Sequence, residues 1–292
     1  MSTPAFDLDG KVALVTGASR GVGAAVAIAL AAQGARVACA ARSTAGTPQR
    51  TPGTLDETVA AIEAAGGTAL PVPTNLANAD EVEAMVTTTV DAFGRLDVLI
   101  NNAAVTFVGD LDIALSRHDL VMGINLHAPF VAIRTAVPHL RAAGGGRIVN
   151  VSSLAALVPI PGLMSYGMSK VALERLTLDL ARQLQPEEIA VNCFRIDLAV
   201  ASEGFVVNTP GADRSGWEPC EVAAEGIVWM VRQPTGYTGR RESMFGLRQR
   251  ERIMASRTGK PAIEPPATEM FDGLYAATEN MFVEPYADAD TA

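Results

Sequence analysis

A cluster of three glycines between a short apolar run and a helix-forming segment constrains this chain more than any other feature. Gly17, Gly21 and Gly23 follow the apolar run 11–16 and open the alanine-rich segment 22–33. Glycine lets the backbone turn sharply and approach a phosphate, and a helix N-terminus supplies N–H groups to bind it. The spacing Gly-x-x-x-Gly-x-Gly differs from the Gly-x-Gly-x-x-Gly of many dinucleotide sites. We predict a phosphate-binding loop, with an ordinary glycine-rich turn as the alternative.

Strand-like and helix-like patterns alternate over the first 200 residues. This alternation predicts an α/β fold, a doubly wound parallel sheet with helices on both faces. We predict strands over 11–16, 36–41, 69–73, 96–101, 147–152 and 190–195, and helices over 22–33, from 54 onward, 79–93, within 111–142, and 166–185. The pattern weakens after residue 240. We therefore predict one domain over 1–240 and a partly ordered C-terminal extension over 241–292.

Composition narrows the class of protein. The chain has 292 residues, 49% hydrophobic and 19% charged, which suits one large domain with a sizeable core. Its net charge of −9 gives no support for binding nucleic acid or an anionic membrane. The three cysteines have no pair spacing and no neighbouring histidine, so we expect neither a disulfide framework nor a metal site. Residues 1–10 lack the apolar segment of a signal peptide, and we expect a cytoplasmic protein without a membrane span.

The end of the second predicted strand bears on the choice of nucleotide. An acidic residue there would bind a ribose 2′-hydroxyl and favour NAD(H), but residues 40–43 read Ala-Ala-Arg-Ser. Arg42, and Arg20 inside the glycine loop, could bind a 2′-phosphate through charge-assisted hydrogen bonds. We therefore predict NADP(H) rather than NAD(H), the alternative being that both arginines are solvated surface groups.

Ser153, Tyr166 and Lys170 form a set suited to proton transfer. Tyr166 and Lys170 are spaced i, i+4 at the start of a predicted helix and share one face. A phenol ionises near pH ~10, and a nearby ammonium lowers that pKa, so Tyr166 could act as general acid or base. Ser153 could hold the substrate oxygen, although Ser152 competes for this role and strand alternation allows only one of them to face the site. The alternative is a buried tyrosine beside a surface lysine.

Together these motifs resemble the short-chain dehydrogenase/reductase family, in its single-domain branch with Thr-Gly-x-x-x-Gly-x-Gly and Tyr-x-x-x-Lys. The resemblance covers about 11–239 and includes Asn101-Asn102-Ala103-Ala104, where the family has Asn-Asn-Ala-Gly. It implies a Rossmann-like fold and a catalytic set of four residues, namely Asn125, Ser153, Tyr166 and Lys170. It also implies that Asn125 holds a water linking Lys170 to solvent, and that Lys170 binds the nicotinamide ribose.

The same resemblance, with the arginine argument, implies where the cofactor binds. The expected cofactor-contacting residues are Gly17, Ser19, Arg20, Gly21, Val22, Gly23, Arg42, Ser43, Asn75, Leu76, Asn101, Ala103, Tyr166, Lys170, Ile196 and Ala199. Family members usually form dimers or tetramers through two long helices, here within 111–142 and 166–185. We therefore expect a homodimer or homotetramer.

The chain departs from the family pattern at three positions. Asn75 replaces an aspartate near the adenine, and Ala104 replaces a glycine, and both changes are mild. The third departure is larger, because Ile196-Asp197 stands where the family usually has Pro-Gly after the sixth strand. Asp197 is expected either to pair with a nearby arginine or to line the nicotinamide end of the site.

The expected function is interconversion of a hydrophobic ketone and a secondary alcohol, as in a ketoreductase. Apolar segments at 154–164 and 200–210, together with Phe107, would form the substrate pocket, and the loop 198–217 would be its lid. An NAD-dependent alcohol dehydrogenase of the same family is one alternative, and a catalytically silent nucleotide-binding sensor is another. An epimerase or dehydratase is disfavoured, because those usually have a different glycine spacing and a larger C-terminal domain.

Overall fold

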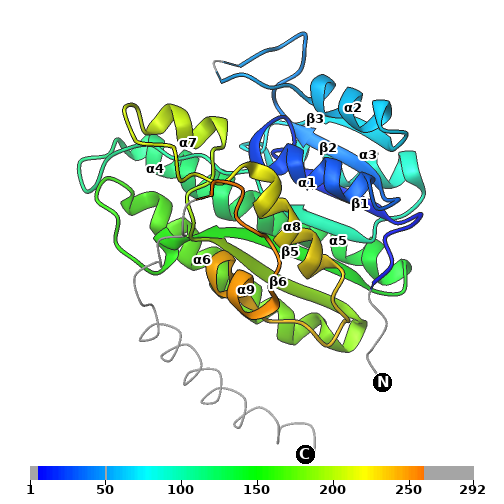
Figure 1. Cartoon of the computed structure of the whole chain (residues 1–292). Helices are drawn as coiled ribbons and strands as arrows, with labels where there is room; N and C mark the ends of the chain where they lie inside the picture. The colour runs from blue at the N-terminus through cyan, green and yellow to red at the C-terminus, as the bar shows by residue number, and fades with distance from the viewer. Residues whose placement is uncertain (1–5, 50, 260–292) are drawn as a thin grey trace, which may run out of the picture.

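The computed structural model describes residues 6–49 and 51–259, and these residues form a parallel sheet of seven strands (Figure 1). The strand order is β3-β2-β1-β4-β5-β6-β7, and every neighbouring pair is parallel. The strands are β1 (Val12–Thr16), β2 (Arg36–Ala41), β3 (Thr68–Pro73), β4 (Val98–Asn101), β5 (Gly146–Ser153), β6 (Ile189–Ile196) and β7 (Arg241–Ser243). Both faces of the central strands are buried, which explains why they read as continuous apolar runs.

Helices cover both faces of this sheet, as the alternating pattern predicts. One face carries α1 (Gly21–Ala31), α2 (Leu55–Ala64), α8 (Cys220–Val231) and α9 (Met244–Glu251). The other face carries α3 (Ala79–Phe93), α5 (Ala128–Ala142) and α6 (Met164–Leu184). Each layer has its own apolar core, and α1 and α8 lie side by side on the first face (Figure 1). The doubly wound α/β prediction is confirmed.

The strand order determines where a ligand can bind. β1 pairs with β2 on one side and with β4 on the other. The connection after β1 therefore leads to one side of this strand, and the connection after β3 crosses to the other side. At such a switch point the loops that follow neighbouring strands diverge, and a crevice opens at the carboxyl ends of the strands. The glycine loop follows β1 directly, and Ser153 ends β5, so both motifs lie at this edge of the sheet.

The long helix predicted within 111–142 is continuous but not uniform. It consists of α4 (Leu115–Met122), a π-helical turn at Gly123–His127, and α5. The span Leu115–Ala142 is long and apolar enough to cross a membrane by length and composition alone. More than half of its most apolar part is buried inside the protein, on the sheet and against α3 and α6, which accounts for that apolar composition.

Two segments are more ordered than the sequence suggests. The lid segment contains a short helix, α7 (Glu203–Asn208), which Figure 1 shows in yellow at the upper left. Residues 241–259, assigned above to the extension, begin with β7 and continue through α9, and they bury Met244, Leu247 and Met254 in the core. β7 was missed because Arg241-Glu242-Ser243 has no apolar side chain. The rest of the predicted extension, 260–292, lies outside the described residues.

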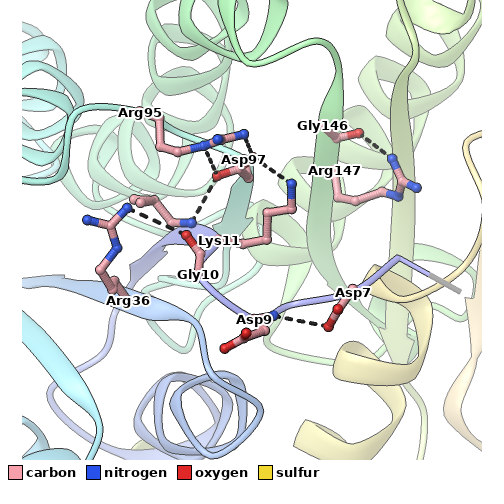
Figure 2. A network of polar contacts seen from close by, with 10 residues as sticks. Asp7, Asp9, Gly10, Lys11, Arg36, Arg95, Asp97, Gly146 and Arg147 are labelled. Carbon is pink, nitrogen blue, oxygen red and sulfur yellow. Dashed lines mark hydrogen bonds and ion pairs between the residues drawn. The ribbon is translucent and has the colours of Figure 1, made fainter.

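The amino ends of the strands are joined by a polar network (Figure 2). Asp97 is 2% exposed and binds Arg95 through two hydrogen bonds of 2.6 and 2.8 Å. The same carboxylate accepts the Val12 N–H at 3.0 Å and lies 3.7 Å from Lys11 Nζ. Since Val12 starts β1 and Asp97 precedes β4, this one side chain fixes the two central strands against each other.

Candidate active site

The glycine loop adopts a backbone that few other residues tolerate. Gly17 has φ +70° and Gly21 has φ +59°. At Gly23 the restriction is steric, because a Cβ there would lie 2.3 Å from the Gly17 carbonyl oxygen. The loop therefore packs tightly against the start of α1, which brings the helix N-terminus to the carboxyl edge of the sheet.

The start of α1 suits an anion. Within the part of the chain that the structure describes, no side chain caps this helix by a hydrogen bond, and its first turn contains no acidic residue. The N–H groups of the first turn and the positive end of the helix dipole are thus left for a ligand. These features fit the pyrophosphate of a dinucleotide.

Thr16 and Asn102 hold the loop against the end of β4, a role that sequence reasoning missed. Thr16 Oγ1 donates to the Ile100 carbonyl and accepts the N–H groups of Asn102 and Ala103 at 3.0 and 3.2 Å. The Asn102 amide donates to the Thr16 carbonyl at 2.9 Å. Thr16 belongs to the Thr-Gly-x-x-x-Gly-x-Gly motif, and Asn102 belongs to the motif at 101–104. These two motifs were the sequence signal from which the contact could have been predicted.

The arginines predicted to contact the nucleotide have different surroundings. Arg20 donates from Nε to the Pro52 carbonyl at 2.6 Å and from Nη2 to the Gly53 carbonyl at 2.8 Å, so it anchors the β2–α2 loop. Ser43 is buried and donates to the same Gly53 carbonyl. Arg42 is exposed at the end of β2. Burial lowers the pKa of Arg20, and the positive charge of Arg42 lowers it further. Two cations therefore lie near each other at this corner.

Ser153, Tyr166 and Lys170 come together at the end of β5. Burial raises the pKa of Tyr166, and hydrogen bonding with the nearby Ser153 works against this rise. Lys170 Nζ donates to the Val151 carbonyl at 2.8 Å and lies 5.5 Å from the centre of the Tyr166 ring.

The environment of Lys170 makes its charge sensitive to pH. The side chain is only 2% exposed, and burial lowers its pKa to about 8. The neighbouring Cys193 and Glu174 oppose this decrease. Lys170 is thus a cation at neutral pH that loses its charge within reach of ordinary assay conditions.

The two candidate serines face opposite ways, as strand alternation predicts. Ser152 points away from Tyr166 and donates to Glu174 Oε1 at 2.7 Å. Arg195 binds the same carboxylate through two bonds of 2.9 and 2.7 Å, and all three side chains are buried. Ser152 therefore belongs to a buried charge pair between α6 and β6, and Ser153 is the serine at the site. Nothing in the local sequence identified this pair.

Asn125 lies in the π-helical turn and is fully buried. Its amide donates to the Val105 carbonyl at 2.9 Å and to Ser169 Oγ at 3.1 Å, while its oxygen accepts the Val105 N–H. Ser169 in turn donates to the Tyr166 carbonyl at 2.7 Å. Asn125 thus links the loop after β4 to the start of α6. Its expected role of holding a water stays a prediction.

Asp197 has partners that the sequence analysis did not foresee. Its carboxylate accepts hydrogen bonds from the Ser243 hydroxyl and from the Phe245 N–H, the latter at 2.9 Å, and so stabilises the start of α9. This contact forms because α9 folds back onto the end of β6. Burial raises the pKa of this carboxylate, and the positive charge of Arg195 also acts on it and works against this rise. The arginine pair and the position lining the nicotinamide end stay predictions.

The remaining predicted cofactor residues lie along the same edge of the sheet. Leu76, Asn101 and Ala103 line one small pocket. Asn75 Oδ1 accepts the Ala77 N–H at 3.2 Å, so it shapes the turn after β3. Ile196 ends β6 opposite Ser153, and Ala199 follows it. Ser19 is buried in the glycine loop and Val22 in the first turn of α1.

A doubly wound sheet with an anion-binding loop after β1 and a Ser–Tyr–Lys set after β5 is the arrangement of a nucleotide-dependent oxidoreductase. The family model described as short chain dehydrogenase matches residues 11–198. An uncharacterized oxidoreductase of Methylorubrum extorquens is 37% identical, over 82% of this chain and 89% of its own. A 3-oxoacyl-[acyl-carrier-protein] reductase of Synechocystis sp. is 39% identical, over 63% of this chain and 72% of its own.

Solved structures agree with this assignment. A metagenomic short-chain oxidoreductase in complex with NADP has a TM-score of 0.67 and 30% identity, covering 82% of this chain and 96% of that one. The chain belongs to the short-chain dehydrogenase/reductase family, and it is an oxidoreductase acting on CH–OH groups. Members of this family use NAD(P) as cofactor.

Proposed function

We propose that this protein is an NADP(H)-dependent reductase that interconverts a hydrophobic ketone and a secondary alcohol, with Tyr166 as general acid and base. The observation that carries the proposal is the buried ammonium of Lys170, which lies 5.5 Å from the centre of the Tyr166 ring, with Ser153 acting to lower the pKa of Tyr166. This arrangement offers a proton to an oxygen atom and stabilises the phenolate that remains.

The bound nicotinamide would supply or accept a hydride at the carbon atom of the substrate. In the reductive direction, Ser153 donates a hydrogen bond that orients the carbonyl oxygen, and Tyr166 transfers its proton to that oxygen as the C–H bond forms. Lys170 stabilises the phenolate by its charge until solvent returns a proton. In the oxidative direction the phenolate takes the alcohol proton.

The preference for NADP(H) over NAD(H) is part of the proposal. It is supported by the exposed cation of Arg42 at the end of β2, with Arg20 close enough to act on it electrostatically. A 2′-phosphate at this corner would form charge-assisted bonds with Arg42, and Arg20 would contribute mainly by fixing the neighbouring loop. A related structure with NADP bound is consistent with this choice.

The substrate is proposed to be apolar because the lid presents apolar side chains. Phe205 of α7 stacks on Trp217 with ring centres 4.6 Å apart, and Val207 is 60% exposed. The relative that acts as a 3-oxoacyl-[acyl-carrier-protein] reductase makes β-keto thioesters a second group of substrates to test.

We also propose that the protein forms a homodimer or homotetramer through α5 and α6. Exposed apolar side chains support this assembly, because Phe130 is 45% exposed and Met168 is 50% exposed. A shallow groove between the two helices is lined by Leu126, His127, Phe130, Ala172, Arg175, Leu176 and Asp179.

A Tyr166→Phe variant tests the proposed chemistry. We expect turnover of ketones with NADPH to fall by about 10²- to 10⁴-fold, since general acid catalysis is lost, while NADPH affinity and thermal stability change little. Steady-state kinetics with aryl ketones and β-keto thioesters, alongside NADPH titration, measure both effects. An undiminished turnover would refute the role of Tyr166, and a wild type without turnover on any carbonyl substrate would favour the nucleotide sensor.

A further inference from the structure

The lid helix α7 lies directly on the glycine loop. A Cβ placed at Gly21 would come within 3.3 Å of both Ser202 Cβ and Glu203 Oε2. Since Gly21 is the first residue of α1, the first residues of α7 contact the helix end that the proposed function assigns to the pyrophosphate. The lid therefore touches the phosphate-binding backbone itself.

The carboxylate that Glu203 brings to this place has no hydrogen-bonding partner for one of its oxygens. Oε2 is buried and makes no hydrogen bond to any residue that the structure describes. The positive charge of Arg20 interacts with Glu203, but Arg20 directs Nε and Nη2 to the Pro52 and Gly53 carbonyls. A carboxylate near an uncapped helix N-terminus is attracted by the helix dipole.

We propose that Glu203 is an internal anion that competes with the cofactor's pyrophosphate for the N-terminus of α1, so that α7 withdraws when the dinucleotide binds. This inference rests on the proposed function only in placing the pyrophosphate at the glycine loop. Glu203 and the pyrophosphate are both anionic, and two like charges a few ångströms apart in a partly buried site repel each other strongly.

The attachment of α7 is suited to such a movement. The helix has six residues, and none of them is buried. On its N-terminal side the chain is anchored at Val200, which forms a bridge with Glu218, and Ala201 donates to the Glu218 carbonyl at 2.8 Å. Beyond that anchor, Phe205 stacks on Trp217, and Arg214 Nη2 donates to the Val206 carbonyl at 3.1 Å. Few contacts therefore have to break for Glu203 to leave Gly21.

The test is to measure dinucleotide affinity in a Glu203→Gln variant. Glutamine keeps the size of the side chain and removes its charge. A Glu83→Gln variant is the matched control, because Glu83 is exposed on α3 and its loss changes the net charge equally. Calorimetric titrations use NADP⁺ and NAD⁺ on wild type and both variants, so no turnover is needed.

A tryptophan signal reports the movement of α7 independently. The chain has two tryptophans, so a Trp229→Phe background leaves Trp217, which stacks on Phe205, as the sole emitter. We expect the emission of Trp217 to shift when NADP⁺ saturates the protein, because its stacking partner moves with α7.

We expect Glu203→Gln to tighten binding of the preferred dinucleotide roughly tenfold, and Glu83→Gln to leave it within about twofold of wild type. An unchanged or weaker affinity in Glu203→Gln, with wild type binding normally, would overturn the inference and leave the proposed function intact. An unshifted Trp217 emission at saturation would overturn the movement of α7. If neither wild type nor Glu203→Gln binds either dinucleotide, the proposed function fails as well.

Discussion

The two ends of the sheet are both rich in charge, but they use it differently. At the amino end, Asp97 is 2% exposed and is bound by Arg95, Lys11 and the N–H of Val12 (Figure 2). At the carboxyl end, Arg42 is exposed and Glu203 keeps an oxygen without a hydrogen bond to any described residue. Charges that are already satisfied hold strands together, whereas charges with remaining capacity can act on a ligand, by attraction at Arg42 and by repulsion at Glu203.

Arg147 extends the contrast at the amino end. It is 5% exposed, donates to the Gln233 and Gly146 carbonyls at 3.0 Å each, and lies 4.3 Å from the Phe6 ring. Burial lowers its pKa to about 10, so it remains a cation at neutral pH. At this end of the sheet, Arg147 thus joins β5 to the N-terminal segment and to the chain after α8.

The largest effect on stability should come from breaking the network at the amino end. Asp97→Asn leaves Arg95 and Lys11 without their carboxylate and places an amide against the Val12 N–H. Weakening the three hydrogen bonds that this buried carboxylate accepts costs about 3 kcal/mol of unfolding free energy. Urea denaturation measures it. Because the site lies at the opposite edge, the NADPH affinity of the folded variant should match wild type.

A smaller effect, confined to binding, is expected from Arg42→Ala at the carboxyl end. NADPH affinity should fall about 10- to 100-fold through loss of charge-assisted bonds to the 2′-phosphate. NADH has no such phosphate, so its affinity is the internal control and should stay constant. Equal losses for both nucleotides would show that Arg42 acts on the shape of the site and not on the phosphate.

The smallest effect is a pH dependence set by Lys170. Its pKa is lowered by burial to about 8, so the cation beside Tyr166 disappears as the pH rises through that value. Ketone reduction should slow above about pH 8, and Lys170→Arg, which stays charged, should move this decline to higher pH. A decline at the same pH in both proteins would assign it to another group.

The same shift predicts how stability varies with pH. Between about 8 and the ordinary value of 10.5, the unfolded chain keeps the lysine proton that the native state has lost. The unfolded state therefore binds more protons, and the unfolding free energy contributed by Lys170 rises with pH through this window. A Lys170→Met variant should lack this rise.

Much of the fold was predictable because its signals are local. Apolar runs and helix patterns alternate, and the helix expected from residue 54 onward begins with a capping box of Thr54 and Glu57. The glycine loop and the choice of Ser153 over Ser152 also follow from local geometry, namely positive φ and strand alternation. These features depend on a few neighbouring residues.

Other features could not be predicted because their partners are distant in the sequence. Asp197 binds Ser243 and Phe245, more than forty residues away. Arg20 resembles a phosphate ligand in the motif, yet it donates to carbonyls of the loop after β2, which folds back onto it. The contact of Glu203 with Gly21 likewise depends on how the lid packs.

The central claim is that the amino end of the sheet holds the fold while the carboxyl end binds the dinucleotide. The most direct test measures unfolding free energy and NADPH affinity for both Asp97→Asn and Arg42→Ala. We expect a crossed result, in which Asp97→Asn loses stability alone and Arg42→Ala loses NADPH affinity alone. If Asp97→Asn weakened NADPH binding in its folded state, or Arg42→Ala left it unchanged, the division between the two ends would be contradicted.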